Sequence, residues 1–134
     1  MSTGFSKEEK AAMRARAKEL EAAAEGEEAI TAALKKMAPA DRKIGARIHA
    51  IVKKTAPDLT PKTWYGMPAY ANRDGKVVVF FRDAGKFKER YSMLGFNEAA
   101  NLDAGSMWPI AYALPKLAKT DEPKIAKLVK QAVS

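Results

Sequence analysis

The fold is decided by the stretch at residues 69–82, which reads AYANRDGKVVVFFR. The Asp74-Gly75 pair in this stretch is typical of a tight hairpin turn, because glycine adopts positive φ at no steric cost. The run from Val77 to Phe81 is apolar on both faces of a strand, which predicts a central, buried strand. Because the two strands of a hairpin run in opposite directions, the stretch predicts an antiparallel sheet.

Other short β-type runs surround this hairpin. Residues 63–65, 90–96 and 107–112 predict three further strands, with a bend at residues 66–68. The apolar run at residues 91–96 is suited to pairing across an exposed sheet edge, so we expect a monomer or a weak homodimer.

Helical spacing governs the rest of the chain. Residues 7–25 predict a helix that starts at Ser6, which forms a capping box with Glu9, and that breaks at Gly26. Its apolar face is thin, so it is expected to pack on the body weakly or to extend from it. Residues 27–37 predict a second helix.

Two more helices are predicted, one before the strands and one after them. One runs from Asp41, as its cap, to about residue 55, and its buried face is Ile44, Ile48, Ile51 and Val52. The last one is capped by Thr120 and buries Ile125, Leu128, Val129 and Ala132. We therefore expect an N-terminal helix at residues 1–25 and one α+β domain at residues 26–134, with about four or five strands.

Composition limits the kind of protein. The chain has 134 residues, a size that fits one domain, and it has no cysteine, which excludes disulfides, thiolate zinc sites and thiol catalysis. It shows no signal-peptide core and no apolar run long enough for a membrane span, so we expect a cytoplasmic location. The net charge is +8, and residues 29–134 carry nineteen Lys and Arg against nine Asp and Glu. A basic body favours anionic partners, although a solubilising lysine-rich surface accounts for it as well.

A second stretch suggests a family. Residues 60–70 read TPKTWYGMPAY, and residues 77–81 (VVVFF) and 91–96 (YSMLGF) extend the pattern. Together they resemble the YdhG-like family, a domain of largely unknown function, over roughly residues 27–133. The resemblance implies a small antiparallel sheet with helices packed on it. Because some members are described as frataxin-like iron chaperones, it also implies iron as a cargo, but the acidic ridge of frataxin-type binding is missing and no iron ligand carries over by motif.

Aromatic and basic residues form the candidate ligand-binding set. Its members share an origin in the predicted strands and the loops beside them, and are Trp64, Tyr65, Met67, Tyr70, Lys86, Arg90, Tyr91 and Trp108. Rings and cations on one face suit a small anion, a nucleotide or single-stranded nucleic acid. The alternative is that most of these rings pack in the core.

Catalytic and metal-binding patterns are weaker. His49 is the only histidine and has no acidic residue three or four positions away, which favours a structural or surface role. Glu21, Glu25 and Glu28 would share a helical face suited to weak binding of a hard cation, unless Gly26 breaks that helix. Neither a nucleophile elbow nor a phosphate-binding glycine loop occurs. We expect a non-enzymatic binding domain, with iron as its only candidate cofactor, and nucleotide or nucleic-acid binding as the alternative.

Overall fold

The computed structural model describes residues 4–134, and in them the chain is an α+β protein. Its elements, in chain order, are α1 Lys7–Lys35, α2 Pro39–Thr55, β1 Thr60–Trp64, β2 Met67–Ala71, β3 Val77–Arg82, α3 Ala84–Phe87, β4 Ser92–Phe96, β5 Ala111–Leu114, a 3-10 turn at Lys119–Asp121, and α4 Glu122–Ala132. Four α-helices and a five-stranded sheet in the described residues confirm the predicted fold class. In this part of the chain, no helix is both long enough and apolar enough to cross a membrane.

The sheet is an antiparallel meander in the order β1-β2-β3-β4-β5. The Asp-Gly hairpin is confirmed: Gly75 has φ 78°, and the Asn72 side chain accepts hydrogen bonds from the Asp74 and Lys76 amides at 3.0 Å each. β3 is central, as predicted, and its Val79 and Phe81 side chains are fully buried. The expected edge at residues 91–96 is wrong, because β4 is paired on both sides and the edges are β1 and β5.

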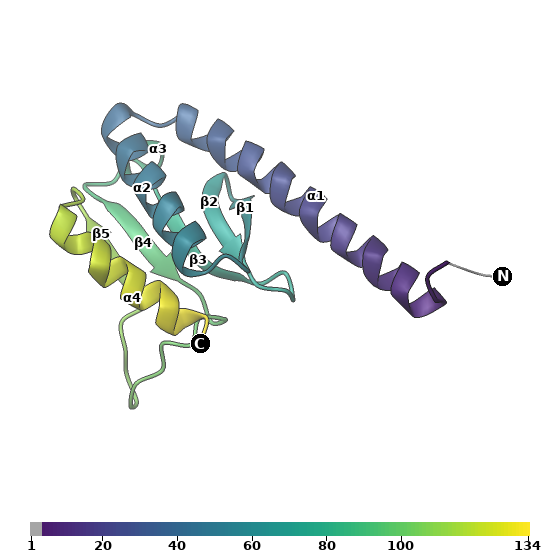
Figure 1. Ribbon diagram of the computed structural model, residues 1–134. Coiled ribbons are helices and arrows are strands. Elements are labelled where there is room, and N and C mark those ends of the chain that lie inside the picture. The colour runs from purple at the N-terminus through teal and green to yellow at the C-terminus, as the bar shows by residue number, and fades with distance from the viewer. Residues whose placement is uncertain (1–3) are drawn as a thin grey trace.

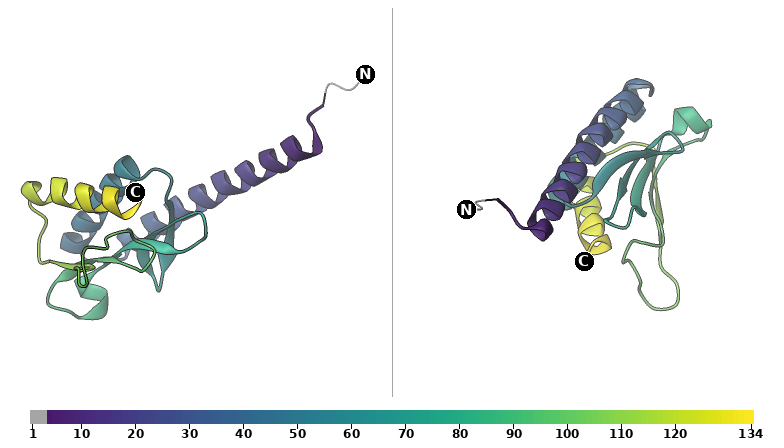
Figure 2. Two further views of the ribbon diagram at one scale, coloured as in Figure 1. Left: turned by 90° about the horizontal axis from the view of Figure 1, so that it is seen from below. Right: turned by 90° about the vertical axis from the view of Figure 1, so that its right-hand side faces the viewer.

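Three helices, α1, α2 and α4, cover one face of the sheet (Figure 1 and Figure 2). The core lies between this layer and the sheet. Its most deeply buried members come from both layers and include Ile30, Ile48, Val129, Val79, Phe81 and Phe96. The predicted buried faces of α2 and α4 are confirmed, apart from Leu128, which is only partly buried.

The predicted break at Gly26 is wrong, because α1 runs through it as a single helix of 29 residues. Gly26 is buried where α1 crosses β1, and a Cβ built on it would lie 1.8 Å from the Pro61 carbonyl oxygen. The glycine therefore does not form a turn; it allows the helix to approach the strand closely. The separate helix predicted at residues 27–37 is the C-terminal end of α1.

Two of the predicted helix caps are wrong and one is right. Ser6 caps α1, since its Oγ accepts a hydrogen bond from the Glu9 amide at 3.1 Å. α2 instead begins at Pro39, whose fixed φ suits a first helical position. This frees the Asp41 carboxylate to accept hydrogen bonds from the Gly85 amide and the Ser92 hydroxyl. Thr120 lies inside the 3-10 turn and caps nothing; α4 starts at Glu122.

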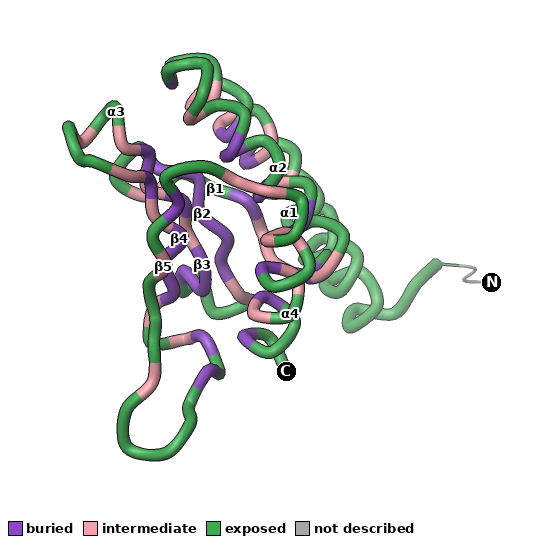
Figure 3. Tube along the Cα trace, turned by 90° about the vertical axis from the view of Figure 1, so that its left-hand side faces the viewer, coloured by how far each residue is buried: buried purple, intermediate pink, exposed green. Residues whose placement is uncertain are grey.

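The first part of α1 projects from the body as an arm, which we define as residues 7–25 (Figure 2). Every residue from Lys7 to Ala22 is exposed, and the exposed colour is continuous along this end of the helix in Figure 3. The arm leaves the body on the side away from α4 (Figure 1).

Candidate functional site

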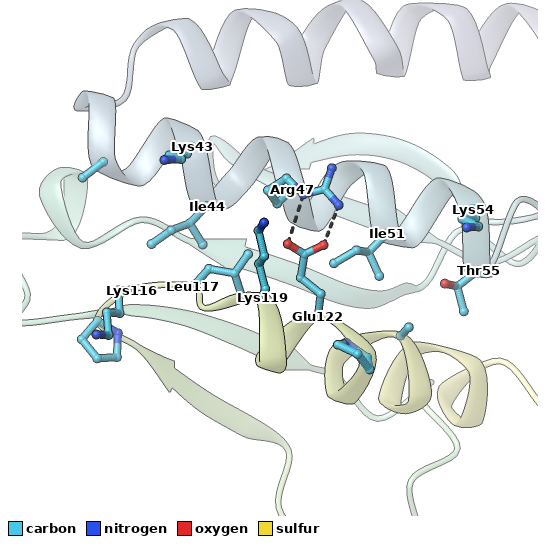
Figure 4. A pocket seen from close by; sticks show the side chains of 14 residues that line it. Lys43, Ile44, Arg47, Ile51, Lys54, Thr55, Lys116, Leu117, Lys119 and Glu122 are labelled. Carbon is cyan, nitrogen blue, oxygen red and sulfur yellow. Dashed lines mark hydrogen bonds and ion pairs between the residues drawn. The ribbon is translucent and has the colours of Figure 1, made fainter.

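A groove with a volume of about 1140 Å³ lies between α2 and α4 (Figure 4). We call it the α2–α4 groove. The residues that line it come from α2, from the segment between β5 and α4, and from the start of α4, and are Ala40, Lys43, Ile44, Arg47, Ile51, Lys54, Thr55, Pro115, Lys116, Leu117, Lys119, Glu122, Pro123 and Ala126. Because both helices also pack on the sheet, the two walls of the groove are fixed by the core.

The floor of the groove is apolar. Ile44 and Ile51 lie two helical turns apart on α2, and their exposed fractions are 7% and 8%. Leu117 and Ala126 contribute from the opposite wall and are partly buried against the core. An aliphatic or other apolar group laid in the groove would therefore exclude water from these side chains.

The rim of the groove is basic on both sides. Lys43, Arg47 and Lys54 come from α2, at positions that share one side of the helix. Lys116 and Lys119 come from the opposite wall, ahead of α4 (Figure 4). The lining thus has five cations against one carboxylate, that of Glu122, so its potential favours a negatively charged ligand.

One ion pair crosses the groove. Arg47 donates from Nη2 to Glu122 Oε1 at 2.5 Å and from Nε to Oε2 at 3.4 Å (Figure 4). The hydrogen bonds and the charge of Arg47 hold the pKa of Glu122 below its ordinary value, and the same contacts raise the pKa of Arg47. A guanidinium has five N–H donors, so these two contacts leave others for an anionic ligand. The pair fixes the Arg47 side chain across the groove.

The structure separates the candidate ligand-binding set that the sequence suggested. Tyr70 and Met67 are both buried, and they lie on opposite faces of β2 because they are three positions apart in a strand. Tyr70 points into the helix-side core, where Trp108 also packs in a partly buried position.

The rest of the set lies elsewhere. Trp64 and Tyr65 make an edge contact beside the β1–β2 turn, and Lys86 donates to the Tyr65 carbonyl at 3.0 Å. The Arg90 guanidinium lies 5.1 Å from the ring centroid of Tyr91, just before β4. Thus Trp64, Tyr65 and Lys86 come together, while Tyr70 and Trp108 do not join them.

His49 has partners that short-range spacing could not reveal. Its Nδ1 lies 2.8 Å from the Tyr70 hydroxyl, and its Nε2 lies 2.7 Å from Glu27 Oε2. Lys53 completes the chain at 2.6 Å from Glu27 Oε1. This chain of side chains joins α1, α2 and β2.

The chain of contacts sets two pKa values. Burial alone would raise the pKa of Glu27, but hydrogen bonds from Lys53 and His49, with their charges, lower it overall. Burial, together with the nearby charge of Glu27, raises the pKa of Tyr70 well above its ordinary value. Such a network is suited to fixing α1 against α2, and it lies apart from the α2–α4 groove.

The expected acidic face offers no cluster for a metal. Glu21, Glu25 and Glu28 do lie on one continuous helix, since Gly26 does not interrupt it, and all three are exposed. Among residues 4–134, no three His, Cys, Asp or Glu side chains are placed together so that they could hold a metal ion. Within the same residues, two other carboxylates, Asp83 and Asp103, belong to no such group either: Asp83 is buried at the start of α3, and Asp103 is exposed in the loop before β5.

Sequence reasoning missed the groove, although part of its signal was present. The sequence predicts the apolar face of α2, but for the basic charge of the body it leaves both an anionic partner and a solubilising surface open. The convergence of the groove cations depends on α4 lying next to α2, which no local pattern specifies.

Comparison with protein-family models, with curated proteins and with solved structures finds no match for this chain.

Proposed function

We propose that this chain is a non-enzymatic binding domain whose ligand is an amphipathic anion held in the α2–α4 groove. The observation that carries the proposal is the ring of five cations around an apolar floor. The apolar part of the ligand would cover Ile44 and Ile51, and its negative groups would pair with the rim. Concave sites of this kind combine apolar burial with a few polar groups that fix orientation.

The lining favours an aliphatic ligand over a nucleotide. No aromatic side chain is among the residues that line the groove, so a base would find no ring on which to stack. Flexible methylene groups, by contrast, fit a floor of isoleucine, leucine and alanine. Each methylene removed from water contributes about 0.8 kcal/mol, so a chain of several methylenes adds substantially to charge pairing.

Two other proposals have less support. Iron delivery follows from the YdhG-like resemblance alone, and the described residues provide no three-ligand cluster for it. Nucleic-acid binding agrees with the net charge of +8, but the rings expected to stack on bases are divided between the core and the β1–β2 turn. We therefore place both below the amphipathic anion.

The test uses dodecyl phosphate, below its micellar concentration, as the probe. Nuclear magnetic resonance of the ¹⁵N-labelled full chain should show saturable shifts of amides in α2, residues 115–119 and α4. Inorganic phosphate should bind at least about tenfold more weakly, because it forfeits the burial of the floor. Equal affinity for the two probes would contradict a role for the apolar floor.

Two double variants distinguish the effect of the groove cations on binding from the effect of the overall net charge. Lys54→Glu with Lys119→Glu reverses charge on both rims and should weaken dodecyl phosphate binding about tenfold or more. Lys124→Glu with Lys130→Glu makes the same change in net charge on exposed positions of α4 that do not line the groove. If both double variants weaken binding equally, or if the unaltered chain binds nothing at about 1 mM probe, the proposal is refuted.

A further inference from the structure

The arm of α1 has an apolar stripe that nothing in the described residues covers. Met13, Ala17, Leu20 and Ala24 follow one another at i, i+4, i+7 and i+11, and so lie along one side of the helix. The large members, Met13 and Leu20, are 52% and 55% exposed. Most of the stability of a helix in a protein comes from packing of its apolar face, so a partner for the stripe would stabilise the arm.

Charge is segregated along the same arm. Residues 7–18 carry five Lys and Arg against two Glu, whereas residues 19–25, which complete the arm, carry three Glu and no Lys or Arg. Two such helices side by side in parallel would align the net basic halves with each other and the acidic halves with each other. In antiparallel orientation the basic half of each helix lies along the acidic half of the other, which is favourable.

We propose that the arms of two copies of this chain pair antiparallel, about a two-fold axis near residues 18 and 19. This register places Met13 opposite Ala24 of the second copy, and Ala17 opposite Leu20, so a large side chain meets a small one in each layer. It also places Arg14 beside Glu21 of the second copy on one flank. By symmetry each of these contacts occurs twice.

The body leaves room for this pairing. Gly26 and Ile30 mark the side of α1 that packs on the sheet. At 100° per residue, the stripe lies roughly 120° around the helix from that side, so a second helix along it passes beside the body. The 19 residues of the arm span about 28 Å, which keeps the two bodies apart at opposite ends of the pair.

The first test measures mass by sedimentation equilibrium on the full chain. The mass should rise with concentration from 14.6 kDa towards twice that value. Arg14→Glu places two glutamates together at both symmetric contacts and should weaken the dimer about tenfold. Lys18→Glu makes the same charge change on the far side of the helix and should leave the dissociation constant unchanged.

The double variant Arg14→Glu with Glu21→Arg distinguishes the two orientations. In the antiparallel pair it exchanges the partners and should restore the original dissociation constant. In a parallel pair Arg14 would instead face Glu9, and Glu21 would face Arg16, so the double variant would remain weak. A chain that stays monomeric up to about 0.5 mM, or a dimer indifferent to Arg14→Glu, overturns the proposal.

Cysteine cross-linking checks the register, because the chain has no cysteine of its own. Met13→Cys and Ala24→Cys are made as separate proteins and oxidised alone or mixed. The mixture should give a disulfide-linked dimer, because opposed layers bring the two positions within the roughly 5.5 Å that a disulfide requires between Cα atoms. Efficient cross-linking of either variant alone, with none gained on mixing, would contradict the register.

Discussion

Replacing Gly26 by alanine places two opposing effects at one position. In the middle of a helix, alanine is favoured over glycine by about 1 kcal/mol. Where α1 crosses β1, however, a Cβ on residue 26 would lie 1.8 Å from the Pro61 carbonyl oxygen and 2.6 Å from its carbonyl carbon. Both atoms belong to backbone, so no rotation of a side chain can relieve the overlap. The helix must therefore move away from the strand.

The size of the effect follows from these two terms. Forcing an added carbon into a well-packed position costs about 1–3 kcal/mol, and more where backbone must shift. Separating α1 from β1 also disturbs Ile30, one turn further along the same side of the helix and fully buried in the core. We therefore expect Gly26→Ala to lower the free energy of unfolding by about 2 kcal/mol, with the favourable propensity already included.

Urea unfolding followed by tryptophan fluorescence measures this change, because Trp64 and Trp108 both lie in the body. Gly45→Ala is a useful comparison, since the nearest atoms there belong to the Leu34 and Phe81 side chains, the closest at 2.6 Å. The Leu34 side chain can rotate, so the loss at residue 45 should be smaller. An unchanged or raised stability of Gly26→Ala would refute the argument from close approach.

Four further predictions concern the buried polar contacts. Tyr70→Phe leaves His49 Nδ1 without its 2.8 Å partner and should lower the free energy of unfolding by about 1–2 kcal/mol, measured by urea unfolding. Because the pKa of Glu27 is lowered on folding, ionised Glu27 contributes to the free energy of unfolding above about pH 4.5, and this contribution is lost as the pH falls below that value. Glu27→Gln should therefore make the free energy of unfolding depend less on pH in this acidic range. The pKa of Tyr70 is raised on folding, so above pH 10 the unfolded chain loses this proton more readily than the folded chain. The free energy of unfolding should therefore fall above pH 10 in the unaltered chain and fall less in Tyr70→Phe. Asp41→Ala removes the acceptor of the Ser92 hydroxyl at 3.2 Å and should cost about 1–2 kcal/mol, whereas Asp41→Asn, which keeps one carbonyl oxygen, should cost less in the same assay.

Local patterns predicted the features that short stretches of chain determine. The Asp74-Gly75 turn needs only a residue that accepts positive φ, and Gly75 provides it. The buried face of α2 follows from the spacing of Ile44, Ile48, Ile51 and Val52, which the helix itself converts into one side. Neither prediction required knowledge of a distant partner.

Features that depend on distant residues were missed or misassigned. The sequence predicts a break at Gly26 because glycine usually weakens a helix. In the structure the glycine is required by the close approach of β1, a strand that begins more than thirty residues later. The sequence predicts Asp41 as a helix cap, but its hydrogen-bond partners lie in α3 and β4. In each case the residue type suited a local role, and tertiary contacts decided otherwise.

The groove and the arm are separate consequences of one charge distribution. Five cations of the body line the groove where α2 meets α4, and the glutamates of residues 19–25 lie on the helix that leaves the body on the other side (Figure 1). Antiparallel pairing of two arms would therefore leave both α2–α4 grooves open. It follows that Lys54→Glu with Lys119→Glu should leave the sedimentation mass unchanged, and that Arg14→Glu should leave dodecyl phosphate binding unchanged. Loss of both properties in either variant would mean that the arm of one copy occupies the groove of the other.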